Sequence, residues 1–410
     1  MRKIIPFAMS VLVAGTSFGA GYKIPEQSTR SMGTAAAYVA GANDADAAYY
    51  NPANMLWMDE GFFTEVGVKY IYLPKITFKG LAPDPLTKTL VSADGKTKSE
   101  SFVVPYLHYV SPKIGRARFG LSLTTPAGLS KRWNLKPQSY FAEEFTLKVA
   151  ELNPVVSYKL NNQISVGAGF RVVYATGVVK YARENLYKVN MDGDTVEYGY
   201  NLAFSLRPDN KSKLALTYRS KVDLNIEGNA EGEIPISSPP TPFKSGGNVT
   251  VPLPAALNIA YAYTIKNRTT VELVYERTFW SEYKELDFNF DDATAEAVLG
   301  QPKTKDWDDS DTIRLGLTHQ INNQFTLLLG FAYDQTPIPT PRVSFELPDS
   351  DGFIYSIGGI YKLSKNLEIG AAYLYVKKRD RNVYNNYNGI VGEFSDSEAH
   401  LFNISAGYKF

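Results

Sequence analysis

The stretch of sequence that indicates the fold most clearly is residues 196–206, VEYGYNLAFSL. Every second side chain in it is large and apolar: Val196, Tyr198, Tyr200, Leu202, Phe204 and Leu206. The side chains between them belong to Glu, Gly, Asn, Ala and Ser. A β-strand points successive side chains to opposite faces. The segment therefore predicts a strand with one apolar face and one face of small or polar groups.

The same alternation recurs along the chain from about residue 60 to the C-terminus, and residues 163–173, 257–265 and 402–410 show it clearly. A soluble β-sandwich would alternate in the same way, but two further features favour a membrane barrel. Aromatic residues lie near the ends of the apolar faces, as in the girdles at a lipid interface. The second faces are rich in Gly, Ala, Ser and Thr, which suit a barrel lumen better than open solvent.

The connections between these segments alternate in length. Six are short: Ser111–Arg116, Asn161–Asn162, Arg207–Ser212, Lys266–Arg268, Asn322–Asn323 and Ser364–Asn366. Seven are long and lie near 80–98, 133–145, 184–194, 229–250, 289–310, 338–351 and 383–396. Short turns on one side and long loops on the other are typical of outer-membrane barrels. We therefore predict an all-β fold, a 14-stranded antiparallel transmembrane β-barrel over residues 57–410, with both ends and the short turns in the periplasm.

The composition excludes several classes of function. The chain has 410 residues, with 43 Lys plus Arg against 42 Asp plus Glu, so it is not a polybasic nucleic-acid binder. It has no Cys, which excludes a disulfide framework, a thiolate metal site and a Cys nucleophile. Its three His residues leave little room for a multi-histidine metal centre. We therefore predict no metal, no cofactor and no nucleic-acid partner.

Residues 1–19 have the features of a secretory signal peptide. Arg2 and Lys3 supply positive charge, the apolar run Ile4–Gly15 follows, and small residues precede a cleavage site. The run is shorter than the ~20 residues that a helix needs to cross a membrane. An exported chain without Cys fits a bacterial envelope, so we expect it in the outer membrane. The last residue, Phe410, resembles the C-terminal aromatic signal by which outer-membrane proteins engage the barrel-assembly machinery.

Residues 20–56 do not alternate. Ser28–Ala42 is rich in Ala and Gly and predicts short helices, and residues 43–46 and 51–54 are turn-forming. The segment carries little charge, which favours packing over a free periplasmic extension. A 14-stranded barrel is wide enough that something should fill it. We predict that residues 20–56 form a plug inside the barrel.

The order of short motifs along the chain resembles the FadL family of outer-membrane transporters for long-chain fatty acids and other hydrophobic compounds. The motifs that carry the resemblance are Ala20-Gly21-Tyr22, Glu26-Gln27-Ser28, Gly33, Ala45–Ala47, Asn51-Pro52-Ala53, Val104–His108, Thr125–Leu129, Leu216–Ser220, Asp334–Pro339, Arg342 and Leu347–Asp349. They cover nearly the whole mature chain in the family's order. The resemblance implies a barrel with an N-terminal hatch, passive uptake without an energy source, no enzyme activity, and a monomer.

The resemblance also implies that substrate leaves through a gap in the barrel wall, near a kink in the third strand. The strand that starts at Ala117 runs into Pro126, Ala127 and Gly128. Proline cannot donate to a ladder and glycine permits a bulge. Unpaired backbone cannot face lipid, so such a break must line a cavity or an opening. The alternative is that the strand has simply reached its extracellular loop.

The hatch motif Asn51, Pro52 and Ala53 has two interpretations as well: a turn that ends the hatch, or a part of its gate.

The residues that bind a ligand are less well defined by the sequence. A fatty acid needs a long apolar pocket, and its carboxylate needs a cation or amide groups. Lys180, Arg183 and Lys284 lie near predicted extracellular strand ends and are candidates, with ordinary solvated rim residues as the alternative. Phe243 lies in the long Pro-rich stretch 234–254, which is a candidate for an apolar groove.

Three other functions stay open at this stage. Uptake of alkanes or monoaromatic hydrocarbons uses barrels of the same kind, and the short connection around 184–194, where better-known family members carry a long helical insertion, leaves the substrate undecided. A plain porin would keep an open lumen, which a plug would obstruct. An outer-membrane lipase would need a site built from residues such as Ser310, Asp311 and His319. The expected partners are hydrophobic small molecules, outer-membrane lipid and lipopolysaccharide.

Overall fold

The computed structural model describes residues 21–410 except 85–86, 88, 184–186, 235 and 238–239. The predicted signal peptide, residues 1–19, therefore lies outside the described residues. In the described part of the chain, no helix has both the length and the apolar character to cross a membrane.

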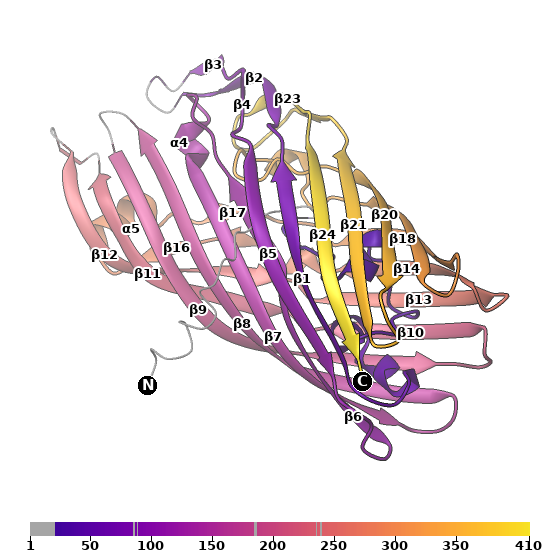
Figure 1. Ribbon diagram of the computed structural model, residues 1–410. Coiled ribbons are helices and arrows are strands. Elements are labelled where there is room, and N and C mark those ends of the chain that lie inside the picture. Colours follow the sequence, from indigo (N-terminus) through magenta and orange to yellow (C-terminus); the bar gives the residue numbers. More distant parts are fainter. Residues whose placement is uncertain (1–20, 85–86, 88, 184–186, 235, 238–239) are drawn as a thin grey trace.

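Long strands make up most of the chain (Figure 1). The wall strands in the first half are β1 (Phe63–Leu73), β5 (Glu100–Val110), β6 (Ala117–Lys131), β7 (Glu144–Lys159), β8 (Ile164–Arg183), β9 (Tyr187–Leu206), β10 (Ser212–Arg219) and β11 (Val222–Ile234). Those in the second half are β12 (Thr241–Leu253), β13 (Ala256–Ile265), β14 (Thr269–Thr278), β16 (Phe288–Phe290), β18 (Ser310–Gln320), β19 (Phe325–Asp334), β20 (Gly352–Lys362), β21 (Leu367–Lys378) and β24 (Glu398–Lys409).

The remaining elements are short. The small strands are β2 (Thr77–Pro83), β3 (Leu90–Ser92), β4 (Gly95–Lys96), β15 (Glu285–Leu286), β17 (Lys303–Thr304), β22 (Arg381–Val383) and β23 (Val391–Ser395). The helices are α2 (Thr29–Gly33), α3 (Ala47–Tyr50), η1 (Pro52–Trp57), α4 (Ser139–Ala142), η2 (Trp280–Glu282), α5 (Ala293–Leu299) and η3 (Thr340–Arg342).

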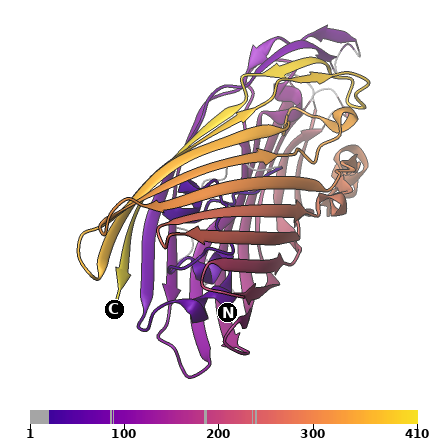
Figure 2. The same ribbon diagram turned by 90° about the vertical axis from the view of Figure 1, so that its right-hand side faces the viewer.

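The wall strands close into a ring. β1 pairs antiparallel with β5 on one edge and with β24 on the other, so Phe63 lies opposite both Val110 and Lys409. The sheet contains 17 strand elements in the described residues. β10 and β11 are two halves of one bent strand, β12 and β13 are two halves of the next, and β16 prolongs β14. The result is the predicted closed antiparallel barrel of 14 strands (Figures 1 and 2).

The two faces of the wall differ as the alternation predicts. In β9, Tyr198 is 60% exposed and Leu202 is 50% exposed, whereas Asn201 and Ser205 between and beyond them are buried. Large apolar groups on the outer surface are costly in water and favourable in lipid. The outer face is therefore the lipid face, and small or polar side chains point into the lumen.

The short turns form for a local reason. Asn161 accepts backbone N–H groups from Gln163 and Ile164, at 2.8 and 2.9 Å, with its side-chain oxygen. Asn322 and Asp209 make the same kind of turn after β18 and β9. Asn and Asp favour such turns because the side chain replaces a backbone acceptor.

Two predicted long loops are wrong. β8 and β9 pair as far as Arg183 opposite Tyr187, and β11 and β12 pair as far as Ile234 opposite Thr241. Most of 184–194 and 229–250 is therefore strand. The outward side chains of β11 are polar, including Glu227 and Glu231. A strand that rises above the membrane needs no lipid face, so its composition resembles that of a loop.

The Pro-rich stretch 234–254 is corrected in the same way, because most of it is strand β12. Pro242 and Pro252 lie in β12 opposite Glu233 and Asp223 of β11. On its other edge β12 pairs with β16 only over Gly247–Val249. Proline is tolerated where a strand edge has no ladder partner, because no N–H is needed there.

The N-terminal segment, residues 21–58, lies within the ring of strands and is drawn in indigo in Figures 1 and 2. Helix α2 contacts β20 and β21, and η1 contacts β7 and β8. Ser28 starts α2 with a capping box, in which Ser28 and Ser31 exchange side-chain and backbone hydrogen bonds. Few charged groups interrupt this segment, and most of its side chains are buried.

Candidate functional site

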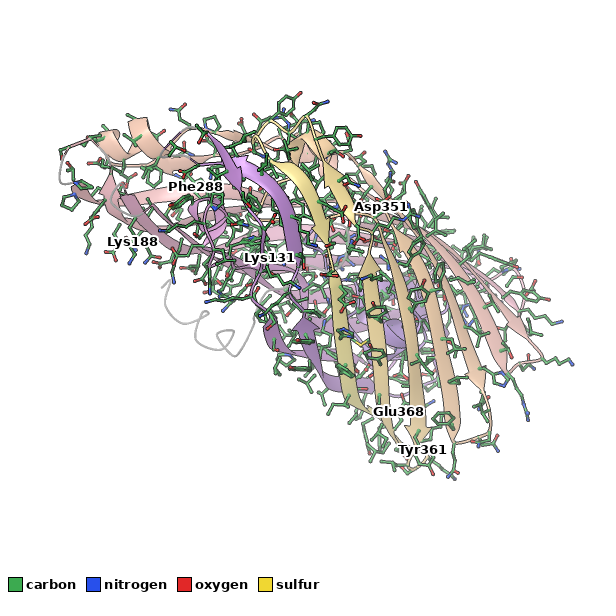
Figure 3. All side chains as sticks on the ribbon, turned by 90° about the horizontal axis from the view of Figure 1, so that it is seen from above. Lys131, Lys188, Phe288, Asp351, Tyr361 and Glu368 are labelled. Atoms are coloured by element: carbon green, nitrogen blue, oxygen red, sulfur yellow. The ribbon has the colours of Figure 1, made fainter. Side chains whose placement is uncertain are left out.

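An apolar pocket lies at the extracellular end of the lumen, above the start of the N-terminal segment. The space between its lining side chains is about 630 Å³ when the open solvent at its mouth is included. The apolar side chains that line it are Tyr22, Leu129, Phe145, Leu147, Val179, Ile226, Val249, Val251, Leu286, Phe288, Trp307, Ile338 and Leu347. Phe288 lies far from the periplasmic strand ends marked by Tyr361 and Glu368 when the molecule is seen from above (Figure 3). The pocket therefore faces the outside of the cell.

Tyr22 forms the floor of this pocket. It is 2% exposed, and its ring meets Trp280 edge-on at a centroid distance of 4.7 Å. Trp307 and Tyr283 complete the aromatic surround, and the Tyr22 hydroxyl donates to the carbonyl of Pro252. Burial raises the pKa of Tyr22 well above its usual value, so the phenol stays neutral. The floor is an uncharged aromatic surface.

Two basic residues line the pocket, and both are already paired. Lys305 binds Glu346 at 2.5 Å. Arg342 binds Asp306 at 2.6 Å and stacks over Tyr387 at 4.3 Å. Burial works against the charged form of Glu346, but the ammonium groups of Lys305 and Lys303 outweigh it and hold the pKa of Glu346 at about 2. The pocket therefore holds polar groups without an unpaired cation at these two positions.

The wall has a break between β5 and β6. β5 pairs with β6 only over Leu107–Val110, opposite Gly120–Leu123. On its other edge β6 stays paired with β7 up to Lys131, with a register shift between Thr124 and Ala127. The third strand therefore bends at Pro126 and does not end there. The alternative that it had reached its loop does not hold.

The N-terminal segment takes the place of β5 along this break. Ile24 donates its N–H to the carbonyl of Pro126 at 2.8 Å, and Gly128 donates to the carbonyl of Tyr22 at 2.9 Å. Lys23 lies opposite Ala127 as in an antiparallel sheet. The backbone groups that β5 leaves unpaired thus find partners inside the barrel, as buried backbone requires.

Contacts beyond the break join the two sides of the wall again. Lys98 donates its N–H to the carbonyl of Arg132 at 3.0 Å. Glu100 of β5 accepts hydrogen bonds from Ser130, at 2.6 Å, and from Arg132. The break is therefore a bounded gap in the strand ladder, with paired strands on its periplasmic side and a backbone bond plus side-chain contacts on its extracellular side.

The Asn51-Pro52-Ala53 motif fixes the body of the N-terminal segment to the wall. The Asn51 amide donates to the carbonyl of Val39 at 3.0 Å, and Ser165 of β8 donates to the carbonyl of Ala53 at 2.8 Å. A Cβ at Gly167 would lie 2.7 Å from the Ala53 nitrogen, so the strand needs glycine at this close approach.

Glu272 of β14 is a second anchor, and the sequence analysis missed it. Its carboxylate accepts three backbone N–H groups, from Val39 and Ala40 at 2.6 Å each and from Gly41 at 2.9 Å. The signal that could have found it is an acidic residue on the lumen face of a strand. A buried carboxylate needs such partners.

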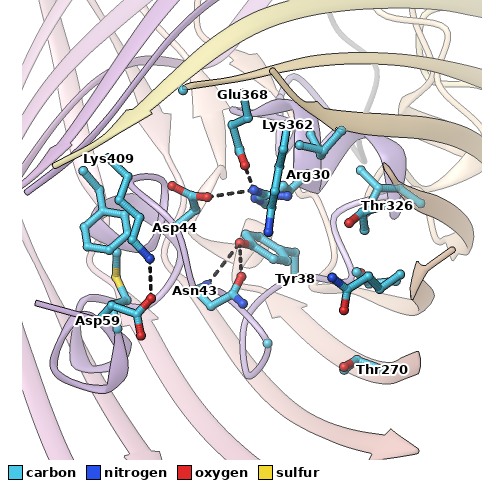
Figure 4. Close-up of a pocket in the computed structure, with 18 of the residues that line it drawn as sticks. Arg30, Tyr38, Asn43, Asp44, Asp59, Thr270, Thr326, Lys362, Glu368 and Lys409 are labelled. Carbon is cyan, nitrogen blue, oxygen red and sulfur yellow. Dashed lines mark hydrogen bonds and ion pairs between the residues drawn. The ribbon is translucent and has the colours of Figure 1, made fainter. Parts of the chain in front are cut away.

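A large polar cavity lies on the periplasmic side of the N-terminal segment (Figure 4). Its cavity volume is about 450 Å³, and it opens to solvent. Arg30 pairs there with Asp44 at 2.7 Å and with Glu368, and Lys409 pairs with Asp59. An apolar molecule would gain little from entering a cavity lined by such groups.

Three of the predicted ligand-binding residues, Lys180, Lys284 and Phe243, do not line the apolar pocket. Lys180 is paired with Glu144 at 3.1 Å at the outer rim, and Lys284 is exposed. Phe243 is buried against Phe290, beside a rim cavity that Lys180 also lines. Arg183 ends β8, and its side chain lies outside the described part of the chain.

The residues considered for a lipase do not form a site. Ser310 and His319 lie at opposite ends of β18, nine residues or ~30 Å apart. Asp311 pairs with Arg277 at 3.0 Å.

Comparisons with known proteins agree with the barrel fold. Residues 10–410 match the family described as outer membrane protein transport protein (OMPP1/FadL/TodX). A long-chain fatty acid transport protein of Salmonella typhi is 26% identical over an alignment 439 positions long. The alignment covers 98% of this chain and 97% of that protein. The crystal structure of a Pseudomonas aeruginosa FadL homologue has a TM-score of 0.80 at 20% identity and covers 95% of this chain and 100% of its own. That of the Ralstonia pickettii toluene transporter TbuX has a TM-score of 0.69 at 16% identity, over 92% and 98%.

Proposed function

Because this chain belongs to the OMPP1/FadL/TodX family of transport proteins and lies in the bacterial outer membrane, we propose that it is a passive uptake channel for long-chain fatty acids or similar hydrophobic compounds. The family consists of transport proteins, which confirms the prediction that the chain is not an enzyme. Flux follows the gradient of the compound across the membrane.

The observation that supports this proposal most strongly is the position of the apolar pocket above the break in β6. Tyr22 forms the pocket floor, and the residues that follow it, up to Ile24, fill the break. A ligand that displaces Tyr22 would therefore loosen the segment that closes the wall. Pro126, Ala127 and Gly128 are the residues beside which we place the lateral exit.

The direction of exit follows from the cost of moving apolar groups into water. Each CH₂ group transferred from an apolar pocket to water costs about 0.8 kcal/mol. The route toward the periplasm passes the charged cavity around Arg30 and Asp44, whereas the break lies in the wall that separates the lumen from the lipid. Lateral exit keeps the substrate in apolar surroundings throughout.

In this scheme the N-terminal segment is the hatch. Its body is held by Asn51 and Glu272, and its first residues move. The exposed C-terminal Phe410, which stacks on Phe62 at 5.7 Å, suits recognition by the barrel-assembly machinery. Closure of the ring within one chain fits a monomer in contact with lipid and lipopolysaccharide.

Monoaromatic or alkane uptake is the second candidate, and one observation favours it. Lys305 and Arg342 are already paired with carboxylates, so neither of these two cations is free to bind the carboxylate of a fatty acid. TbuX, a relative in fold, is a toluene transporter by name.

Uptake of labelled oleate tests the proposal. Cells without a transporter of their own would receive the wild type, a P126V/G128V variant that restores strand-forming residues at the break, and a P154V control. Pro154 is an exposed proline in β7, the strand paired with the other edge of β6, and it lies opposite Leu121 on the periplasmic side of the break. We expect saturable uptake by the wild type and the control, and little by P126V/G128V with its barrel folded. Wild-type uptake by a folded P126V/G128V would reject the lateral exit, and uptake of toluene without oleate would favour the second candidate.

A further inference from the structure

We propose that the side chain of Gln27 is the latch of the wall break, and that its release from Thr125 is the step that opens the break to lipid. This inference rests on the proposed lateral exit. It concerns a residue whose contacts join all three strands around the break.

Gln27 completes the ladder of β6 where the hatch backbone cannot. Tyr22 and Ile24 form hydrogen bonds to β6 with their backbone groups, whereas the backbone groups of Thr125 are hydrogen-bonded to a side chain. The Gln27 amide donates to the carbonyl of Thr125 at 2.7 Å, and Thr125 donates its N–H to the Gln27 Oε1 at 3.2 Å. A carboxamide carries the same donor and acceptor groups as a peptide bond. Gln27 therefore acts as a one-residue substitute for β5.

The orientation of this amide is fixed by further partners. Gln27 Nε2 also donates to the carbonyl of Ile24 at 2.6 Å, and Oε1 also accepts from the Lys69 ammonium at 3.0 Å. Gln27 has no exposed surface. Every hydrogen-bonding group of its amide is thus engaged, and a rotation of the side chain would leave several buried groups without partners.

The partners come from both sides of the break. Lys69 belongs to β1, and it also donates to the carbonyl of Glu26 at 2.6 Å. His108 belongs to β5, where its Nε2 lies 2.8 Å from the carbonyl of Gln27 and its Nδ1 lies 2.9 Å from Ser122 of β6. Gln27 therefore joins β6 to the β1–β5 side, which is the pairing that the break lacks.

The same residue connects the break with the apolar pocket. The carbonyl of Ile24 accepts a hydrogen bond from the Gln27 amide, and its N–H donates to the carbonyl of Pro126. Tyr22 lies two residues before Ile24, at the pocket floor. Movement of Tyr22 would pull on Ile24 and withdraw one of the bonds that orient the Gln27 amide. Release leaves buried hydrogen-bonding groups without partners, so the free energy that an apolar ligand gains in the pocket must offset that cost.

The absence of Cys from the sequence allows a first test of the lateral exit itself. Lys23 and Ala127 lie opposite each other as in a sheet, which places their Cα atoms about 4.5–5.5 Å apart, within disulfide range. We expect K23C/A127C to lose oleate uptake when oxidised and to recover it when reduced, with K23S/A127S as the control. Full uptake in the locked form would reject the lateral exit and, with it, the basis of the latch.

The latch is tested by access to the break from the lipid. In an A127C background, Gln27→Leu keeps the side-chain size and removes both bonds to Thr125. We expect bilayer-dissolved pyrene maleimide to label Cys at 127 about fivefold faster or more. A cysteine at Ala40, in the anchored hatch body, should stay protected. Gln138→Leu removes another buried amide, at α4, and should leave labelling at 127 unchanged.

Gln27→Glu provides a second variant if Gln27→Leu does not fold. It keeps the acceptor for Thr125 and Lys69 and loses the donor to Thr125, so we expect a smaller increase in labelling. Wild-type labelling rates in both variants, with the barrel folded and the disulfide lock effective, would overturn the latch while leaving the lateral exit intact. Faster labelling at position 40 as well would show a loosened hatch and would also overturn it.

Discussion

Lys305 and Glu346 show how one residue pair affects the choice of ligand. Both line the apolar pocket, and the two charges of their ion pair cancel. We expect Glu346→Gln to free the Lys305 ammonium, so that oleate binds up to about tenfold more tightly, a gain of about 1.4 kcal/mol. Quenching of tryptophan fluorescence near Trp307 would measure it.

The control ligand for this variant is oleyl alcohol, which has the same tail and no charge. Its affinity should stay the same in Glu346→Gln. Equal gains for the acid and the alcohol would mean that the substitution enlarges the pocket and does not free a cation.

The same pair predicts a pH dependence. Because the pKa of Glu346 is about 2 in the folded protein and 4.5 when unperturbed, the stability that its charge contributes is present above pH 4.5 and is lost as the pH falls toward 2. We expect oleyl alcohol affinity and tryptophan fluorescence to stay constant from about pH 8 to about pH 5, and to change only in more acidic solution. A transition near neutral pH would contradict this assignment.

Glu272 gives a second prediction at this scale. Glu272→Ala would leave the buried N–H groups of Val39 and Ala40 without an acceptor, each at a cost of about 1–3 kcal/mol, and would also remove the part-buried bond from Gly41. We expect faster proteolysis within residues 39–43, while the barrel keeps its heat-modifiable migration on gels. Glu282→Ala, at an exposed carboxylate, is the matched control and should not change the rate.

At the scale of single elements, η1 and its Asn51-Pro52 entry hold the N-terminal segment in place, and the proposed function gives them a role in transport as well. The Asn51 amide donates to the carbonyl of Val39, and the N–H of Val39 is one of the three that the Glu272 carboxylate accepts. We expect replacement of Asn51 and Pro52 to alter oleate uptake while heat-modifiable migration persists. Loss of that migration would mean that the motif serves folding alone.

The elements also show which parts of the fold the sequence could predict. Alternation in the membrane band predicts the strands because lipid outside and small groups inside act on every second residue. Above the membrane this contrast disappears, and β11 with Glu227 and Glu231 therefore resembled a loop. The kink at Pro126 was visible because proline and glycine act locally.

The contacts that build the site were not predictable in the same way. Lys305 and Glu346 are 41 residues apart, and Gln27 and Thr125 are 98 apart. Nothing in their local sequence reports the partner. Lys180 and Lys284 had the right charge near the right strand ends, yet their side chains lie at the rim or in solvent, because the position of a strand end does not fix the direction of its last side chains.

At the scale of the whole molecule, the N-terminal segment occupies the lumen between the apolar pocket and the periplasmic cavity. We expect the wild type to show no large steady conductance in a planar bilayer, and a variant without residues 21–58 to conduct. Large steady conductance of the wild type would instead support a porin.

The break in β6 has a consequence for how an opening of this barrel can be observed. The gap is closed by the hatch and not by a neighbouring strand, so it can open without disrupting any of the strand-to-strand ladders. Circular dichroism and amide infrared bands would register almost nothing. Deuterium uptake at the amides of Thr125 and Gly128 would change strongly. A spectrum that reports an intact barrel is thus equally compatible with a sealed membrane protein and with one whose side is open to the bilayer.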